Sequence, residues 1–321
     1  MATPRVLTTL KALRRAPSRA VVTVGVFDGV HVAHQRLIRS TVTLARRCAG
    51  TSVVVTFDPD PQLVLDPAHA PPALMPLDAR IAYLKALGVD WVWVLPFTKR
   101  FARMTARTFI QDILVRRLHA VTVVLGEAFV FGRNRQGDMD TLKAFGSAHG
   151  IRVISVPQVK RQGQPVSSSR IRRLIHDGRL VQARALLGRP PALYGVVVRG
   201  AGRGRRLGFP TANIQLMTQA LPPQGVYAVL VESRTGHGRW EGVMNFGVRP
   251  TFGQGPLVCE VHLLKFSGRL LWRSVAVSLI GRLRGERCFP SPETLRRQIL
   301  RDVARARQRF SRTPILHLAS A

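Results

Sequence analysis

Apolar positions in the first half of the chain form short β-branched runs that alternate with longer stretches of helical periodicity. Runs of about five residues between helical stretches of about ten or more are typical of βαβ units. The predicted strands are Val21–Val26, Ser52–Phe57, Trp91–Leu95, Val121–Leu125 and Arg152–Val156. The predicted helices are Gln35–Cys48, Leu77–Ala86, Ala106–Arg117 and Met139–His149. The pattern predicts an α/β doubly wound parallel sheet, with ligands bound at the carboxyl ends of its strands.

The second half has a different pattern, in which short apolar runs are separated by Gly and Pro. Residues 167–188 have helical periodicity, and Arg189-Pro190-Pro191 interrupts it as a predicted linker. The strands predicted after the linker are Val196–Val198, Val226–Val231, Trp240–Asn245, Val258–Leu264 and Val275–Leu279. Short strands with turn residues between them indicate an antiparallel sheet or a small barrel.

The last apolar pattern predicts one amphipathic helix over Pro292–Phe310, with Ser291 as its N-cap. The final eleven residues are expected to form a loose tail. The change of pattern at the linker predicts two domains, residues 1–188 and 189–321.

The net charge is unusually positive. The chain has 49 basic and 17 acidic residues, a formal net charge of +32, and 43 of the basic residues are arginines. Such a balance indicates either a partner rich in phosphate or a compositional bias of the source genome. Because the basic residues are spread along the whole chain, the bias explains most of them, and a few arginines remain for phosphate. Exposed-looking aromatic pairs are scarce and a recognition motif is absent, so we expect no nucleic-acid partner.

Composition argues against several other classes of protein. No run approaches the roughly 18 apolar residues that a membrane helix needs. Arg14, Arg15 and Arg19 occupy the place where a signal peptide has its apolar core. Three scattered cysteines are too few for a disulfide framework or a zinc site. We therefore expect a cytoplasmic protein that does not bind a membrane.

The segment Gly25–His34 follows the first predicted strand and leads into a helix. Glycines let the backbone approach a phosphate there, and the helix N-terminus adds its positive dipole end. His31 and His34 are three residues apart, so both rings can face that phosphate and donate hydrogen bonds to it. Two histidines taken alone are more often ordinary surface residues, and their place after the first strand favours the phosphate site.

The segment Val166–Arg172 begins the helical stretch that follows the sheet. Its three hydroxyls and free N–H groups can form an anion cradle, in which Arg172 clamps phosphate oxygens. The simpler alternative is a serine N-cap beside solvated arginines.

The barrel half contains a glycine-rich stretch, Gly195–Gly208, followed by Phe209-Pro-Thr-Ala-Asn213. Such glycine spacing permits a loop that covers phosphate, although a pair of tight turns has the same signature. Thr211 and Asn213 offer neutral oxygens to a hard cation such as Mg²⁺. Glu260 is an acidic residue in an otherwise apolar strand, and it is either a general base or a carboxylate paired with an arginine.

Four motifs of the first half resemble, in order, those of the prokaryotic bifunctional riboflavin kinase and FMN adenylyltransferase family, also called FAD synthetase. They are Gly25–His34, Thr56–Pro61, Gly126–Gly132 with Gly137, and Ser167–Arg172. The second half resembles the riboflavin kinase domain of the same family. Its motifs are Pro210–Asn213, Leu221–Tyr227, Asn245–Gly247 with Pro250–Phe252, Glu260–Leu264, and the pattern from Leu283 to Arg307. The resemblance covers roughly residues 5–310, and four ordered motifs are far more specific than one.

The resemblance implies a nucleotidyltransferase-like first domain that transfers AMP from ATP to FMN, which gives FAD and pyrophosphate. His31 and His34 would then act on the α-phosphate as catalytic residues, together with Arg172. The residues implied in ATP binding there are Gly25, Phe27, Asp28, His31, His34, Ser168, Ser169 and Arg172.

For the second domain the resemblance implies an antiparallel β-barrel with a C-terminal helix that phosphorylates riboflavin to FMN. Glu260 would activate the flavin hydroxyl, and Thr211 and Asn213 would hold Mg²⁺. The residues implied in nucleotide binding there are Gly200, Gly204, Gly208, Pro210, Thr211 and Asn213.

The sequence departs from the family pattern at a few positions. Ala33 replaces a glycine between the histidines, Asp60 replaces a histidine, and Ala128 stands where an acid or amide is usual. In the kinase half, Lys265 and Trp272 are departures. Two alternatives therefore stay open: a riboflavin kinase with a weakened adenylyltransferase domain, and a basic nucleic-acid-binding protein on a retired enzyme scaffold. The sequence leaves the oligomeric state open.

Overall fold

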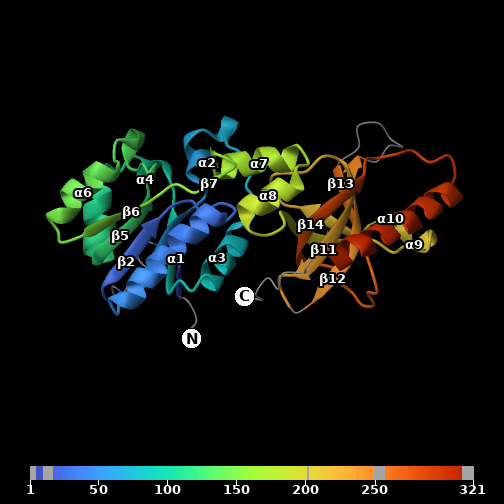
Figure 1. The fold of residues 1–321 in the computed structure, drawn as a ribbon, viewed down its shortest axis with the longest axis horizontal. Coiled ribbons are helices and arrows are strands. Elements are labelled where there is room, and N and C mark those ends of the chain that lie inside the picture. The colour runs from blue at the N-terminus through green and yellow to red at the C-terminus, as the bar shows by residue number, and fades with distance from the viewer. Residues whose placement is uncertain (1–4, 10–16, 201, 237, 249–256, 313–321) are drawn as a thin grey trace. The chain divides into compact units, whose positions relative to one another are not determined.

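The computed structural model describes residues 5–9, 17–200, 202–236, 238–248 and 257–312 (Figure 1). The chain forms two compact units. Of the described residues, the first unit contains those up to Pro71 and Leu77–Ser168, and the second contains Pro72–Pro76 and those from Ser169 to Arg312. The domain boundary between residues 188 and 189 stays a prediction.

The first unit is built on a six-stranded sheet in the order β1-β4-β3-β2-β5-β6, in which every neighbouring pair is parallel. The strands are β1 (Arg5–Leu7), β2 (Ala20–Val24), β3 (Ser52–Asp58), β4 (Trp91–Pro96), β5 (Ala120–Gly126) and β6 (Arg152–Val156). The strand order reverses at β2, which lies between β3 and β5. The loops after β2 and β5 therefore flank the switch point, where sheets of this kind bind ligands.

Helices occupy the connections between these strands. They are α1 (Val32–Arg47), α2 (Pro61–Leu65), η1 (Pro67–His69), α3 (Leu77–Ala86), α4 (Lys99–Ala102), α5 (Ala106–Phe109), η2 (Ile110–Arg117), η3 (Arg133–Arg135) and α6 (Met139–Ser147). A small hairpin, β7 (Lys160–Arg161) with β8 (Gln164–Pro165), follows β6. The helix predicted over residues 106–117 exists, but its second part, η2, is wound as a π-helix, with Leu118 N–H donating to the Ile113 carbonyl.

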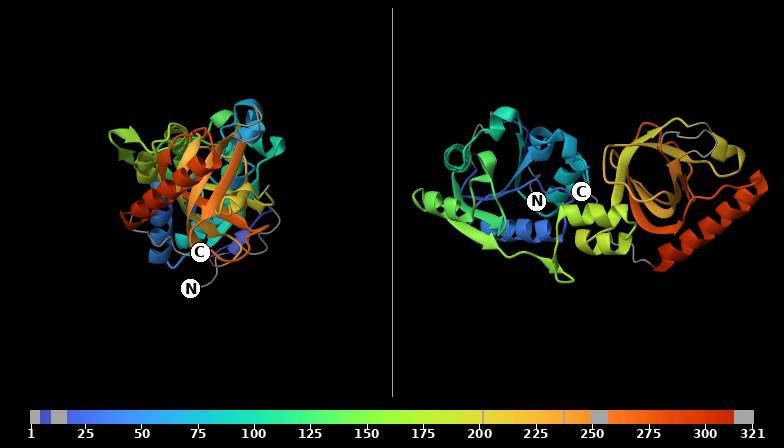
Figure 2. Two further views of the ribbon diagram at one scale, coloured as in Figure 1. Left: turned by 90° about the vertical axis from the view of Figure 1, so that its right-hand side faces the viewer. Right: turned by 90° about the horizontal axis from the view of Figure 1, so that it is seen from above.

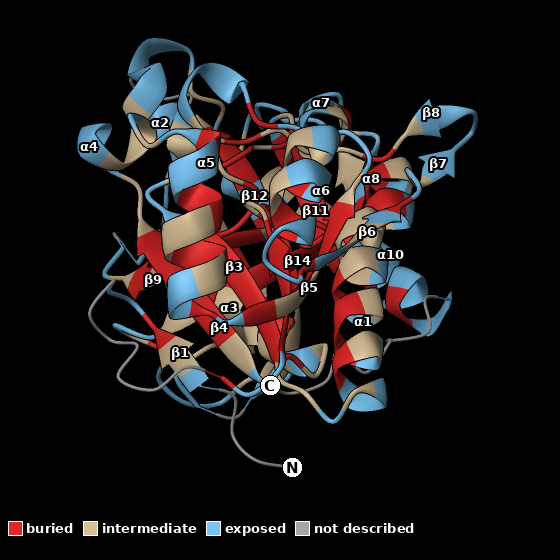
Figure 3. Ribbon diagram, turned by 90° about the vertical axis from the view of Figure 1, so that its left-hand side faces the viewer, coloured by how far each residue is buried: buried red, intermediate tan, exposed pale blue. Residues whose placement is uncertain are grey.

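Both faces of the sheet are buried, which explains why its strands are continuous apolar runs. Val22 and Val24 point into a core shared with Ile110 and Ile113 of η2. Val21 lies on the other face, in a cluster with residues of α1. Figure 3 shows the buried strands and the buried side of α1 in red. The doubly wound sheet predicted from the sequence is confirmed.

The second unit begins with two short helices, α7 (Ser168–His176) and α8 (Leu180–Leu187), where the sequence predicted continuous helical periodicity. Gly178 has a φ of +71°, and its N–H donates to the Ile175 carbonyl. Glycine adopts this left-handed conformation without strain, so the first helix ends there. The helical periodicity predicted over residues 167–188 therefore corresponds to two helices.

The rest of the second unit is a closed antiparallel barrel in the order β10-β13-β12-β11-β14-β9, with α10 outside it (Figure 2, right). The elements are β9 (Ala192–Val198), α9 (Arg203–Arg206), β10 (Ala212–Leu216), β11 (Gly225–Ser233), β12 (Arg239–Val248), β13 (Leu257–Leu263), β14 (Ser274–Arg284) and α10 (Pro292–Arg312). Alternate residues fill the barrel, for example Tyr227, Val229 and Val261. Those between them face outward, where Val226 and Ala228 pack against Val303, Ala306 and Phe310 of α10.

The sequence missed strands β1 and β10, and most predicted barrel strands are shorter than those observed. Ser291 accepts a hydrogen bond from the N–H of Thr294, which confirms the predicted cap of α10. Of the predicted tail, residues 311 and 312 belong to α10, and the others lie outside the described residues.

Candidate active sites in the two units

The turn between β2 and α1 lies at the switch point of the sheet and contains Phe27, Asp28 and His31, all buried. Phe27, Gly29 and Val30 have φ values of +55°, +78° and +37°. Non-glycine residues in this region are strained, and such strain collects at functional sites. His31 is the N-cap of α1, and its Nδ1 accepts a hydrogen bond from the N–H of His34 at 3.3 Å. This hydrogen bond fixes the His31 ring at the start of α1.

The two histidine rings stack face to face, with centroids 3.5 Å apart and an angle of 17° between the rings. The edge of Phe27 closes the other side of His34, with centroids 5.2 Å apart. Burial, and then the neighbouring charges of His31 and Arg80, hold the pKa of His34 well below its ordinary value of 6.5. Its Nδ1 is buried and has no hydrogen-bond partner among the described residues. An uncharged ring with an unpaired buried nitrogen indicates a ligand at this position.

Arg80, on α3, is a buried cation beside this turn that the sequence analysis did not single out. Its Nη1 donates to the Val26 carbonyl at 2.6 Å, to Thr56 Oγ1 at 3.3 Å and to the Phe57 carbonyl at 3.4 Å. Arg80 thus joins the carboxyl ends of two neighbouring strands. With 43 arginines in the chain, no sequence signal separated this one from the others.

Replacing Arg80 by Met tests its effect on His34. Loss of the cation removes one of the causes that lower the pKa of His34, so this pKa should rise toward 6.5, whereas Arg80→Lys should keep it low. The acceptors left unpaired should lower the free energy of unfolding by about 1–3 kcal/mol. NMR titration of the His34 ring and urea unfolding measure the two effects. An unchanged His34 pKa in the Met variant would show that burial and His31 alone account for the shift.

The structure places some of the predicted ATP-binding residues at the β2–α1 turn and others in the second unit. Ser168 Oγ donates to the Asp28 carbonyl at 2.9 Å, so this serine lies at the β2–α1 turn within the first unit. Ser169 and Arg172 belong to the second unit, where Arg172 Nε donates to the Pro72 carbonyl at 2.7 Å. Their contact with the polyphosphate therefore stays a prediction.

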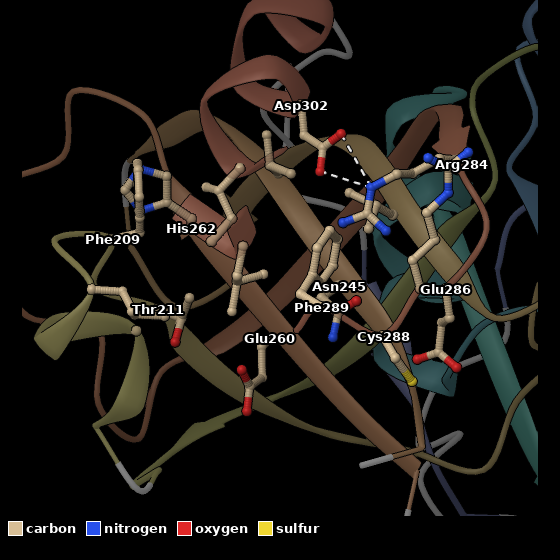
Figure 4. A pocket seen from close by; sticks show the side chains of 17 residues that line it. Phe209, Thr211, Asn245, Glu260, His262, Arg284, Glu286, Cys288, Phe289 and Asp302 are labelled. Carbon is tan, nitrogen blue, oxygen red and sulfur yellow. Dashed lines mark hydrogen bonds and ion pairs between the residues drawn. The ribbon is translucent and has the colours of Figure 1, made fainter. Parts of the chain in front are cut away.

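The second site is a cavity of about 710 Å³ between the outer face of the barrel, the loop after β14 and α10 (Figure 4). Asn213 of β10 pairs with Glu260 of β13, which in turn pairs with Asn245 of β12. Residues directly opposite in an antiparallel pair share one face of the sheet. The three oxygen-bearing side chains therefore form a row across the outer face, and Glu260 and Asn245 line the cavity.

The glycine-rich loop closes over this row. A Cβ at Gly200 would collide with the side chain of Asn213, and one at Gly204 would meet Thr211 and the Phe209 carbonyl. Gly208 has a φ of +83°, which glycine adopts easily. Glycine at positions 200 and 204 therefore lets the loop backbone lie directly against the side chains of Asn213 and Thr211, beyond any flexibility that it gives the loop. The Pro210 carbonyl lies 2.9 Å from Nδ1 of His262, a cavity residue that the sequence analysis missed.

The far side of the cavity contains an ion pair and an apolar wall. Arg284 Nε donates to both oxygens of the buried Asp302, at 2.9 and 3.2 Å, and lies over the ring of Phe289. Gln298 donates to the same carboxylate at 2.9 Å, so the buried charge is well satisfied. Glu286 and Cys288 line this side as well (Figure 4). The cavity lining thus combines charged and polar groups with an apolar wall, which suits an amphipathic ligand.

The polar end of the cavity fits a magnesium ion that binds together with substrate phosphates. Thr211 and Glu260 present hard oxygen donors there, and Asn213, the cross-strand neighbour of Glu260, carries an amide on the same face of the sheet. Among the described residues, no group of three His, Cys, Asp or Glu side chains could hold a metal alone. Mg²⁺ commonly uses one or two protein ligands, waters and phosphate oxygens, so the donor set is sufficient.

Three residues that depart from the family pattern, Asp60, Lys265 and Trp272, lie at a helix cap or in turns. Asp60 caps α2 by accepting a hydrogen bond from the N–H of Gln62 at 2.9 Å. Lys265 and Trp272 are exposed turn residues with φ values of +53° and +67°, and neither lines the cavity. Pro250–Phe252 lie outside the described residues.

Comparison with known proteins gives one consistent result. The FAD synthetase family model matches residues 13–170, and the riboflavin kinase model matches residues 187–310. The bifunctional riboflavin kinase/FMN adenylyltransferase of Escherichia coli K12 is 38% identical over 302 residues, which cover 94% of this chain and 96% of that protein. The protein of the same description from Haemophilus influenzae is 37% identical, covering 90% and 94%.

A solved structure described as a macrolide-efflux protein from Streptococcus pneumoniae is 32% identical, with a TM-score of 0.83 over 94% of this chain and 98% of that one. In the part of this chain that the structure describes, no helix is long and apolar enough to span a membrane. Identity above 30% along nearly the whole length, and two family models in the same order, establish the relationship. The chain belongs to the family of bifunctional riboflavin kinases/FMN adenylyltransferases.

Proposed function

We propose that the chain converts riboflavin to FAD in two ATP-dependent steps, one in each unit. The barrel transfers the γ-phosphoryl group of ATP to the riboflavin hydroxyl, and the product is FMN. The parallel-sheet unit transfers AMP from ATP to FMN, and the products are FAD and pyrophosphate. The match of one family model to each unit supports this division.

Adenylyl transfer is assigned to the turn between β2 and α1. The helix N-terminus and the rings of His31 and His34 bind the α-phosphate and donate hydrogen bonds as negative charge grows on its oxygens. The low pKa keeps the His34 ring uncharged at pH 7, and an uncharged imidazole still carries one N–H donor. Arg80 holds the turn, and burial, His31 and Arg80 together keep the pKa of His34 low. Ser168, Ser169 and Arg172 are proposed to hold the remaining phosphates.

Phosphoryl transfer is assigned to the cavity beside the barrel. Glu260 accepts the proton of the flavin hydroxyl as it attacks the γ-phosphate. Thr211 and Asn213 are proposed to hold Mg²⁺, which would neutralise charge on the ATP phosphates when bound. Gly200 and Gly204 bring the loop backbone next to these side chains. The apolar side of the cavity, with Phe289, Leu295 and Ile299, is proposed to hold the flavin ring.

One observation carries the assignment to two active sites: the unpaired buried nitrogen of His34 at the switch point. A unit that served only as support for the kinase would gain nothing from a buried polar atom without a partner. Purified protein given FMN and MgATP should therefore release FAD and pyrophosphate in equal amounts. Phosphorylation of riboflavin without this second reaction would support the kinase-only alternative.

A fragment of residues 189–321 tests the predicted domain boundary. It should phosphorylate riboflavin, because it contains all six barrel strands and α10. The longer fragment from Ser169 is the matched control, since it keeps Leu180, which is part of the barrel core. The shorter fragment should melt at a lower temperature. If neither fragment makes FMN while the full chain does, the kinase does not function independently of the first unit.

The cytoplasmic location stays a prediction.

A further inference from the structure

One helix of the second unit, α10, is especially rich in arginine. α10 has 21 residues and contains seven of the 43 arginines. All seven are exposed, and they are Arg296, Arg297, Arg301, Arg305, Arg307, Arg309 and Arg312. Its two acidic residues do not balance them, because Asp302 is buried against Arg284 and Glu293 lies in the first turn. The exposed side of α10 is therefore strongly cationic.

Four of these arginines form a continuous ridge. Arg297, Arg301, Arg305 and Arg309 follow one another at intervals of four residues, so they rise by about 6 Å each and extend over about 18 Å. Like charges at this spacing destabilise a helix. Every Asp and Glu of the chain lies within the described residues, and none forms an ion pair with the ridge. Glu293, one turn before Arg297, interacts with that arginine electrostatically. No acidic side chain of the described residues forms an ion pair that relieves the repulsion among Arg301, Arg305 and Arg309.

The C-terminal part of the ridge borders a hollow of about 490 Å³. Its lining consists of Arg305, Gln308, Arg309 and Arg312 of α10 with Leu283 of β14, and it includes no carboxylate. Arg309 is held in place, because its Nη2 donates to the Arg282 carbonyl at 3.2 Å and its guanidinium lies where Gly281 has no side chain. Several guanidinium groups around one hollow form a site for phosphate oxygens.

We propose that the arginine ridge of α10, with this hollow, binds the phosphate backbone of duplex nucleic acid without sequence preference. The ridge is far longer than a small anion, which favours a linear polyanion. The apolar side of α10 packs on the barrel through Val303, Ala306 and Phe310, so it cannot enter a membrane. Phe310 is the only aromatic residue of the helix and is buried, so α10 offers no platform on which single-stranded bases could stack. Binding to the phosphate backbone of a duplex needs no sequence-recognition motif. The absence of such a motif from the sequence therefore does not argue against this kind of binding.

A labelled DNA duplex and the full-length protein test the proposal by fluorescence anisotropy across a salt series. Binding in the range of about 10⁻⁴–10⁻⁶ M at physiological salt is expected, with a slope of log K against log salt of about −4 for four or five neutralised phosphates. The combined change Arg301→Gln, Arg305→Gln and Arg312→Gln should make the slope shallower by about 2.7. Lys at the same three positions should preserve binding, because the charge is kept.

The matched control removes three exposed arginines of the first unit, by Arg46→Gln, Arg47→Gln and Arg152→Gln. It changes the net charge equally and should leave the slope nearly unchanged. Riboflavin phosphorylation by the ridge variant should stay normal, which verifies its fold. Equal losses in the two Gln variants would overturn the proposal, since binding would then follow net charge. Tighter binding to single strands than to the duplex would also overturn the proposal. Binding to vesicles of anionic lipid without binding to DNA would overturn it as well.

Discussion

Replacement of His34 by Ala should lower the rate of FAD formation from supplied FMN by about 10²–10³, the usual cost of losing one transition-state hydrogen-bond donor. Formation of FMN from riboflavin should stay near the wild-type rate, because that reaction is assigned to the other unit. The change also removes the ring that stacks on His31 at 3.5 Å, so His31 loses part of its support. Initial rates of the two reactions, measured separately with MgATP, give the comparison.

His69→Ala is the control for this experiment. His69 is an exposed histidine at the end of η1 in the same unit, and its ring contacts Asp66, the N-cap residue of that helix. Its loss should change neither rate. If His34→Ala slowed both reactions equally, the histidine would be a structural residue. Unchanged rates of both reactions would remove it from the site altogether.

Glu260→Gln should lower kinase turnover by roughly 10²–10⁴, the range expected for loss of a general base, with the KM for ATP little changed. Gln keeps the shape of the side chain between Asn213 and Asn245 but cannot accept the proton. Adenylylation of supplied FMN should persist. Steady-state kinetics on riboflavin and ATP separate turnover from binding.

Glu232→Gln serves as the matched carboxylate control. Glu232 lies on the barrel strand β11, 3.5 Å from Arg239, and does not line the cavity. Its replacement should lower the melting temperature without lowering turnover. If Glu260→Gln behaved in this same way, Glu260 would be a structural partner, and the base would have to lie elsewhere in the cavity.

Elements with a strong period could be predicted from the sequence, whereas elements that depend on distant partners could not. Leu77–Ala86 and Arg152–Val156 have the predicted bounds, because each combines a clear apolar pattern with a clear end. Strand β10 was missed although Ala212, Ile214 and Leu216 alternate correctly, since its polar residues were considered only as a motif. Closure of the barrel depends on the pairing of β10 with β13 and β9, which no local pattern reveals.

The candidate sites divide in the same way. His31, His34, Thr211 and Glu260 could be singled out because residue type and position agreed. The role of Arg80 depends on three acceptors 23 to 54 residues away in the chain, and only the fold brings them together. Likewise, the arginines of α10 could be counted in the sequence, but packing on the barrel decides which side of the helix stays exposed.

The central claim is that one chain carries both activities, and a time course with riboflavin and MgATP tests it most directly. Chromatographic separation of the products should show FMN first and FAD later, with two ATP consumed for each FAD formed. His34→Ala should stop the same reaction at FMN. Accumulation of FMN alone with the wild-type protein, or no conversion of riboflavin at all, would contradict the account.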